Sequence, residues 1–143
     1  MSDDVINESV ASRYRLGEQL GEGGIAEVFR ATLTGAEGFT MAVAIKRVLP
    51  RLSTLPRYDD MLAQEARLVS QLAHPNIVKV LDLQWDAEGR LFLVMEFVDG
   101  MDLARLMTSG PLPASVAVFV IAEILSGLAY APRCWARPAT SSV

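Results

Sequence analysis

The sequence has few of the residues that mark secreted, disulfide-bonded or nucleic-acid-binding proteins. It contains one cysteine, Cys134, in 143 residues, which excludes an internal disulfide and favours a reducing compartment. The formal net charge is −4 and no run of lysine or arginine occurs, so we expect no nucleic-acid partner. The opening MSDDVINESVASRY is acidic and polar, unlike a secretory signal peptide. We therefore expect a cytoplasmic protein.

One long apolar segment contrasts with this acidic start. Hydrophobic residues make up 51% of the chain, and the segment LPASVAVFVIAEILSGLAYA, residues 112–131, concentrates them. A membrane span needs about 20 largely apolar residues. Glu123 lies in the middle of the segment, and a charge there costs at least ~3 kcal/mol in a bilayer. We favour a buried core helix, and a membrane anchor over residues 112–131 is the alternative.

The hydrophobic periodicity predicts an α+β fold with a five-stranded antiparallel sheet and one main helix. Residues 14–48 have the pattern of three strands in a meander, and two more strands are expected within 77–85 and 90–98. Apolar residues recur at helical spacing over 57–73. A short helix is expected within 102–107 and a second one over 114–130, ended by Pro132.

A glycine cluster separates the first two expected strands. The stretch LGEGGIAEVFRA, residues 20–31, places three glycines, Gly21, Gly23 and Gly24, within four positions. Glycine permits tight turns, and it also lets backbone approach a ligand closely. The cluster alone does not distinguish a hairpin turn from a loop that covers a phosphate.

A carboxylate lies where the main helix is expected to be apolar. At about 100° per residue, Glu65 falls in the middle of one apolar arc, which consists of Met61, Leu62, Leu68, Val69 and Leu72. A carboxylate on a core-facing stripe is costly unless a cation meets it. In the strand MAVAIKRV, Lys46 shares a face with Ala42 and Ala44, so it ends a row of small side chains that leaves space for a flat ligand. We predict that Lys46 and Glu65 form an ion pair.

Together these residues resemble the amino-terminal lobe of the eukaryotic-like protein kinases, in particular their bacterial Ser/Thr branch. The resemblance covers about residues 14–131 and depends on four motifs in the family's order. These motifs are GEGGIAEV at 21–28, VAIK at 43–46, Glu65 within QEARLVSQLAHPNIV, and LVMEFVDGMDL at 93–103. The resemblance implies a kinase-like lobe over residues 12–98, with 99–131 as two helices that begin an incomplete carboxyl-terminal lobe.

The resemblance also implies an ATP site. The glycine loop would cover the phosphates with backbone N–H groups, and Ala26 stands where the family has a third glycine. Val28 and Ala44 would sandwich the adenine, and Lys46, oriented by Glu65, would hold the α- and β-phosphates. Met95 would be the gatekeeper. The complete set of expected ATP-binding residues is Leu20, Gly21, Gly23, Gly24, Ala26, Val28, Ala44, Lys46, Met95, Glu96, Val98 and Asp102.

The parts of the family that perform phosphoryl transfer do not appear in the sequence. After GLAY the chain runs APRCWARPATSSV, without the His-Arg-Asp loop or the Asp-Phe-Gly ligands for Mg²⁺. We expect no metal site and no kinase activity from this polypeptide alone. The favoured explanation is that the sequence is a truncated or frame-shifted translation of a full kinase gene. The alternative is a short pseudokinase-like module that binds a partner kinase.

The remaining expectations concern the ends of the chain and its surface. Residues 1–11 are interpreted as a flexible terminus and 132–143 as an irregular tail. An orphan helix over 114–130 would expose an apolar face, so self-association through it is expected. His74, in the sequence HPN, is expected to fix the turn after the main helix and to have no catalytic role.

Overall fold

The computed structural model describes residues 13–135, and side chains up to Ala131. The predictions for residues 1–11 and for most of the 132–143 tail therefore lie outside the described residues. The chain divides into two compact units. The first comprises the residues up to Ser70 together with Lys79–Phe97, and the second comprises Gln71–Val78 together with the residues from Val98 onward.

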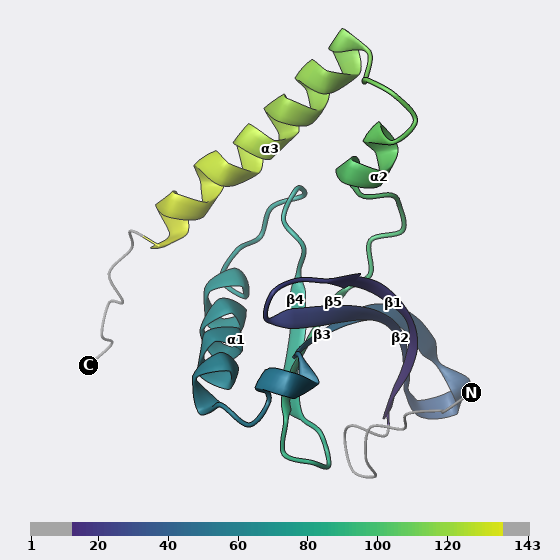
Figure 1. Cartoon of the computed structure of the whole chain (residues 1–143), viewed down its shortest axis with the longest axis vertical. Coiled ribbons are helices and arrows are strands. Elements are labelled where there is room, and N and C mark those ends of the chain that lie inside the picture. Colours follow the sequence, from purple (N-terminus) through teal and green to yellow (C-terminus); the bar gives the residue numbers. More distant parts are fainter. Residues whose placement is uncertain (1–12, 136–143) are drawn as a thin grey trace. The chain divides into compact units, whose positions relative to one another are not determined.

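The first unit contains a five-stranded antiparallel sheet in the order β1-β2-β3-β5-β4 (Figure 1). The strands are β1 (Tyr14–Glu22), β2 (Ala26–Thr34), β3 (Thr40–Val48), β4 (Val80–Trp85) and β5 (Leu91–Glu96). Short 3₁₀ turns, η2 (Ala36–Gly38) and η3 (Pro50–Leu52), follow β2 and β3. The predicted fold class, with the meander over 14–48 and two later strands, is confirmed.

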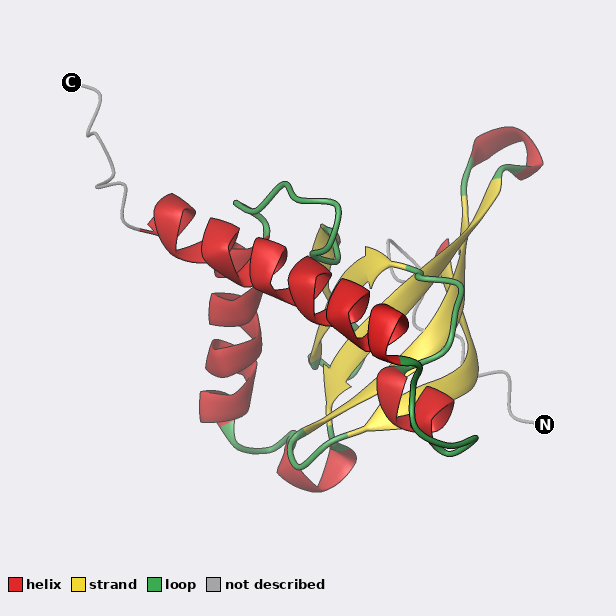
Figure 2. Cartoon of the chain, turned by 90° about the horizontal axis from the view of Figure 1, so that it is seen from above, coloured by secondary structure: helices red, strands yellow, loops and turns green. Residues whose placement is uncertain are grey.

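The two faces of the sheet bury different clusters, as the period of two requires. One cluster comprises Tyr14, Ala31, Val43, Ile45, Phe92 and Val94. The other comprises Val48, Leu91 and Leu93 from the sheet with Leu62 and Ala66 from helix α1 (Pro56–Val69). Figure 2 shows this helix beside the yellow sheet. The β3 residues Ala44 and Lys46 lie on the α1-bearing face, because they alternate with Val43 and Ile45.

Helix α1 differs from its predicted form in its end and in its buried face. It begins with a proline in its first turn and ends at Val69, before the expected Ala73. Its buried residues are Leu62 and Ala66, whereas Met61 is 50% and Leu68 39% exposed. Leu62 was part of the predicted apolar arc and is buried, but the centre of that arc was wrong, because the sheet meets the stripe of Leu62 and Ala66.

The first turn of α1 contains a carboxyl whose pKa is raised. Burial is the main cause of the raised pKa of Asp59, and the charges of Asp60 and Asp86 add to it against a lowering hydrogen bond with Leu91. The folded state therefore binds the proton of the Asp59 carboxyl more tightly than the unfolded state does. The stability that this proton contributes is lost as the pH rises through the folded-state pKa.

We expect wild type to lose stability relative to Asp59→Asn as the pH is raised from about 3 to about 6. Thermal unfolding at intervals across this range measures the effect. Glu37→Gln, at an exposed position in η2, is the control and should run parallel to wild type. Parallel curves for Asp59→Asn and wild type would contradict the pKa shift.

The second unit contains helices α2 (Leu103–Met107) and α3 (Ala114–Trp135) and the segment 71–78. The side chain of Asp102 caps α2, with its Oδ1 accepting a hydrogen bond from the N–H of Arg105 at 2.7 Å. The expectation that Pro132 ends the last helix is wrong, since α3 continues to Trp135. A proline removes one helical hydrogen bond and strains the preceding turn, which a helix can survive near its end.

Segment 71–78 is fastened to α3 by polar contacts around Glu123. The side-chain amide of Asn76 donates to Glu123 Oε2 at 2.6 Å and to the Glu123 carbonyl at 2.9 Å. The N–H of Ala73 donates to the Tyr130 hydroxyl at 3.2 Å. The N–H of Asn76 also donates to His74 Nδ1 at 3.1 Å, which confirms that His74 fixes this turn. The carboxylate in the apolar helix thus has a hydrogen-bonding partner within its own unit.

Most of the apolar surface of α3 is exposed. Val118 and Phe119 are 67% and 64% exposed, and segment 71–78 contacts the helix near Gly127. The expectation of a buried core helix is therefore wrong for the described residues. The window Ala114–Ala131 has a mean hydropathy of 1.9 with 6% of it buried, so α3 could cross a membrane by length and composition alone. The core helix of a soluble protein meets the same two criteria.

Candidate functional site

The expected ion pair between Lys46 and Glu65 is present. Lys46 Nζ lies 2.7 Å from Glu65 Oε1 and 2.8 Å from Oε2, so the ammonium contacts both carboxylate oxygens. Strand β3 supplies the lysine and helix α1 the glutamate. The side chains are 25% and 41% exposed, so the pair is only half-buried and remains open to a ligand. Such a pair combines a fixed geometry with accessible positive charge.

Sheet register places the other expected residues beside Lys46. Val28 is paired with Lys46 across β2 and β3, and Ala44 is paired with Met95 across β3 and β5. Directly paired residues lie on the same face of a sheet, so all four belong to the face that α1 covers. Ala44 is 7% exposed, and Val28 is half-buried. The sheet therefore brings together the lysine and the expected adenine walls.

The glycine turn is one end of the β1–β2 hairpin. The N–H of Gly23 donates to the carbonyl of Ala26 at 2.8 Å, which closes the turn. Neither Gly21 nor Gly24 has a positive φ, and a Cβ added at either would meet no atom within 4 Å. The fold itself therefore requires glycine at neither position. Close approach of a ligand to the backbone is the remaining physical reason for glycine there.

A small cavity of about 80 Å³ lies between the glycine turn, β3 and α1. Its lining consists of Ile25, Ala26, Lys46, Val48, Tyr58, Met61, Leu62 and Glu65. The expected site residues did not include five of these, namely Ile25, Val48, Tyr58, Met61 and Leu62. The spacing of Tyr58 from Glu65, two helical turns, places both on one side of α1 and is a signal that could have found it. The ion pair thus borders a cavity with mostly apolar walls.

The remaining expected residues divide between the two units. Leu20 is 44% exposed beside an irregularity in the β1–β2 register. The N–H of Glu96 already donates to the carbonyl of Lys79 at 3.0 Å, so a backbone bond from Glu96 to a ligand would have to use its carbonyl. Val98 and Asp102 belong to the second unit, and their approach to a ligand stays a prediction.

The residues that the structure describes do not fit a catalytic metal. Between Arg13 and Ala131 there is no group of three His, Cys, Asp or Glu side chains that could hold a metal ion. Beyond Asp102, the only carboxylate in the sequence is that of Glu123, and it accepts the Asn76 amide. We therefore derive no step through Mg²⁺.

The arrangement of sheet, helix, lysine and glutamate is that of a protein kinase lobe, and sequence comparison agrees. The model of the protein kinase domain family matches residues 14–133. The chain therefore belongs to the protein kinase domain family. This confirms the resemblance inferred from the glycine turn, VAIK and Glu65.

Individual relatives are bacterial kinases that are much longer than this chain. Tyrosine-protein kinase MasK of Myxococcus xanthus is 42% identical over 123 residues, which are 82% of this chain and 19% of that protein. Serine/threonine-protein kinase pkn3 of Myxococcus xanthus is 31% identical over 129 residues, 89% of this chain and 23% of that protein. The chain thus spans about a fifth of the length of these relatives.

A solved structure shares the fold. The kinase domain of PknI from Mycobacterium tuberculosis superimposes with a TM-score of 0.64 at 24% identity. The match covers 84% of this chain and 47% of that domain. At this identity the likeness supports the fold alone.

Proposed function

We propose that this chain is the ATP-binding part of a cytoplasmic protein Ser/Thr kinase. In this proposal, the glycine turn covers the phosphates and Lys46, oriented by Glu65, binds them. The observation that carries the proposal is the Lys46–Glu65 contact, with 2.7 and 2.8 Å to the two carboxylate oxygens. The Ser/Thr acceptor is supported by the name of pkn3, whereas MasK is named a tyrosine kinase.

The contact supports phosphate binding because it fixes a long, flexible cation. A lysine side chain loses about 1.5–2 kcal/mol of conformational entropy when it is ordered. Glu65 orders Lys46 before any ligand arrives, so that cost is already met in the free protein. Val28 and Ala44 would then offer apolar walls for the adenine on the same face of the sheet.

The glycines provide an independent test of this proposal. Gly21→Ala is expected to leave stability unchanged or to raise it by about 0.4–1 kcal/mol, because the backbone is compatible with alanine and the space is open. We expect the same change to weaken ATP binding, because a methyl group would keep the phosphates from the backbone. Thermal unfolding and ATP titration of the same sample measure both. A variant with unchanged ATP affinity would contradict the role of the turn.

The same proposal includes inactivity of the 143-residue chain in phosphoryl transfer. The sequence lacks the aspartate that would receive the hydroxyl proton, and loss of a general base typically costs about 10²- to 10⁴-fold. We expect no incorporation of phosphate from ATP and Mg²⁺ into proteins that offer Ser, Thr and Tyr. Clear incorporation that disappears in Lys46→Ala would overturn this part of the proposal.

An interaction module is the second candidate, favoured by the exposed apolar surface of α3. Val118 and Phe119 are typical of a face that packs against another protein or a second copy. We infer that a chain which uses this face would self-associate or bind a partner kinase. Sedimentation of wild type and of the double variant Val118→Ser/Phe119→Ser measures whether each protein is a monomer or an oligomer. A monomer in both cases would exclude self-association through α3.

Titration with ATP distinguishes the two candidates. Saturable binding supports the nucleotide site, with weak affinity expected because the first unit offers few groups to the phosphates. A folded protein that does not respond to ATP supports the interaction module. Membrane fractionation tests the remaining hypothesis, a membrane anchor at residues 112–131. Recovery of the chain in the soluble fraction would exclude this anchor.

A further inference from the structure

The tip of the glycine turn is fastened to the segment that follows β3. The N–H of Leu49 donates to the carbonyl of Ile25 at 2.9 Å. Arg51 Nη2 donates to the carbonyl of Gly24 at 3.2 Å. Two consecutive carbonyls of the tip are therefore held from one side. We propose that Arg51 is a positioning residue for nucleotide phosphates, acting through the Gly24–Ile25 peptide; this inference rests on the proposed ATP site.

The hydrogen bond from Arg51 to the Gly24 carbonyl also fixes the direction of the next backbone N–H, that of Ile25. The described backbone contains no cis peptide, so the carbonyl of Gly24 and the N–H of Ile25 point in opposite directions. When Arg51 holds the carbonyl, the N–H of Ile25 is directed away from Arg51. A ligand that covers the open side of the turn then meets a backbone donor of fixed direction. Without Arg51, this peptide could turn about the ψ angle of Gly24, because glycine restricts its own backbone least.

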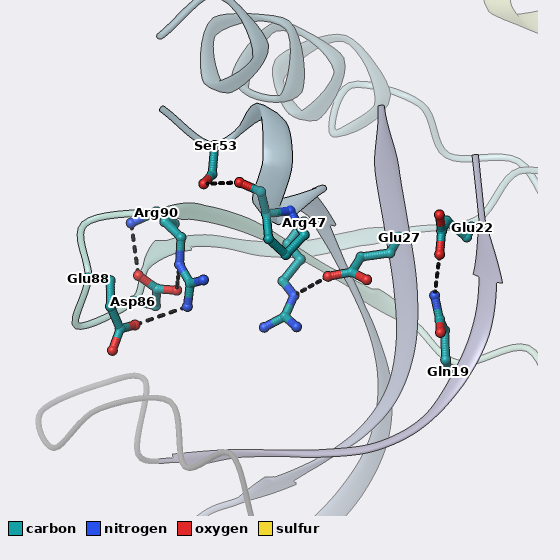
Figure 3. A network of polar contacts seen from close by, with 9 residues as sticks. Gln19, Glu22, Glu27, Arg47, Ser53, Asp86, Glu88 and Arg90 are labelled. Carbon is teal, nitrogen blue, oxygen red and sulfur yellow. Dashed lines mark hydrogen bonds and ion pairs between the residues drawn. The ribbon is translucent and has the colours of Figure 1, made fainter. Parts of the chain in front are cut away.

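The backbone on both sides of Arg51 is held in place by burial and by hydrogen bonds. Leu49 is 4% exposed, which anchors the start of the segment. The 3₁₀ turn η3 closes with a bond from the N–H of Leu52 to the carbonyl of Leu49 at 2.8 Å. The Ser53 hydroxyl donates to the carbonyl of Pro50 at 2.8 Å, a bond drawn in Figure 3. The backbone of Arg51 is thus held on both sides while its side chain is exposed.

The charge of Arg51 differs from that of the neighbouring cations. Lys46 is paired with Glu65, and Arg47 is paired with Glu27 at 2.7 Å. Arg51 makes no ion pair with any carboxylate of the described residues. Its full positive charge therefore lies beside the two glycines of the turn, Gly23 and Gly24. This placement favours an anion over a neutral group at the turn.

The test compares nucleotides that differ in phosphate content. Arg51→Ala is expected to weaken ATP binding about fivefold, the worth of one hydrogen bond near 1 kcal/mol, and to change adenosine binding less than about twofold. Arg51→Lys keeps the charge and one donor but not the guanidinium fork, so it should restore only part of the ATP affinity. The melting temperature should remain unchanged, because the side chain is exposed.

Arg67→Ala is the matched control. This arginine is also exposed, and it lies two residues beyond Glu65 on α1, which places it on the opposite side of the helix from the candidate site. The control removes the same charge and should lower ATP affinity less than about twofold, as expected for a screened surface charge.

Three results would overturn the inference. If wild type binds ATP and Arg51→Ala binds it equally well, Arg51 has no positioning role while the ATP site stands. If Arg51→Ala weakens ATP and adenosine equally, the effect is a general structural one. If wild type does not bind ATP at all, the proposed function fails and this inference fails with it.

Discussion

Replacing Glu27 with alanine is expected to lower the free energy of unfolding by about 3–5 kcal/mol, the cost of leaving a buried charge without its partner. Glu27 is 8% exposed, and its Oε1 accepts a hydrogen bond from Arg47 Nε at 2.7 Å (Figure 3). The Arg47 side chain is 16% exposed and its guanidinium lies 4.8 Å from the Phe29 ring centroid. Water therefore cannot replace the lost carboxylate without opening this part of the sheet.

Glu18→Ala provides the control for this prediction. Glu18 also pairs with an arginine, Arg30, but at 3.9 Å and with side chains that are 68% and 51% exposed. An exposed pair contributes about 0–1 kcal/mol, so the control should remain close to wild type. Urea unfolding followed by circular dichroism measures both variants. Equal small losses for Glu27→Ala and Glu18→Ala would show that the Glu27–Arg47 pair is not effectively buried.

Phe92→Ala is expected to destabilise the first unit by a similar amount, about 3–5 kcal/mol. Phe92 is 1% exposed at the centre of the cluster opposite α1. Its ring meets that of Tyr14 edge-on, with centroids 5.8 Å apart. Alanine would remove this contact and leave a cavity between β1 and β5. Because domains of this size are typically stable by about 5–15 kcal/mol, a large share of the total would be lost.

Phe39→Ala is the control for the Phe92→Ala prediction. Phe39 is 57% exposed, so its truncation removes little buried area and should cost less than about 0.5 kcal/mol. The same urea titration distinguishes the two. A loss below 1 kcal/mol for Phe92→Ala would mean that the cluster collapses around the missing ring, and would contradict the prediction of a lasting cavity.

The part of the fold that sequence could predict is the part where one periodicity dominates. In β3, Val43 and Ile45 alternate with Ala44 and Lys46, and this alternation alone separated the face of Val43 and Ile45 from the lysine-bearing face. The same reasoning singled out Glu65 as a carboxylate that needs a cation. Both inferences concern local pattern plus the cost of burying charge, and the Lys46–Glu65 contact is present.

The predictions that failed depended on how elements pack against each other in the folded chain. The apolar arc of α1 had its centre misplaced, because Ala66 joins Leu62 against the sheet whereas Met61 and Leu68 are exposed. A helical wheel contains no information about the position of the sheet. Pro132 does not end α3, because a single proline costs a helix one bond and some strain without forbidding the next turn.

Arg51 could not be assigned a role from sequence at all. Its neighbours in the sequence, Pro50 and Leu52, indicate only a turn between a strand and a helix. Its contact with Gly24 joins positions 27 residues apart, and no periodicity reports such a distance. Likewise, the cavity beside Lys46 exists only once the glycine turn, β3 and α1 are assembled. Sequence therefore identified the ion pair of the candidate site but not the contacts that orient the turn beside it.

The most direct test of the central claim is a calorimetric titration of wild type and Lys46→Met with ATP and with adenosine. If the ammonium held by Glu65 binds the phosphates, wild type should bind ATP at least about tenfold more tightly than Lys46→Met does, since a charge-assisted hydrogen bond is worth about 1.5–3 kcal/mol. Adenosine should bind both proteins alike. Equal ATP affinity in the two proteins, with both folded, would contradict the account.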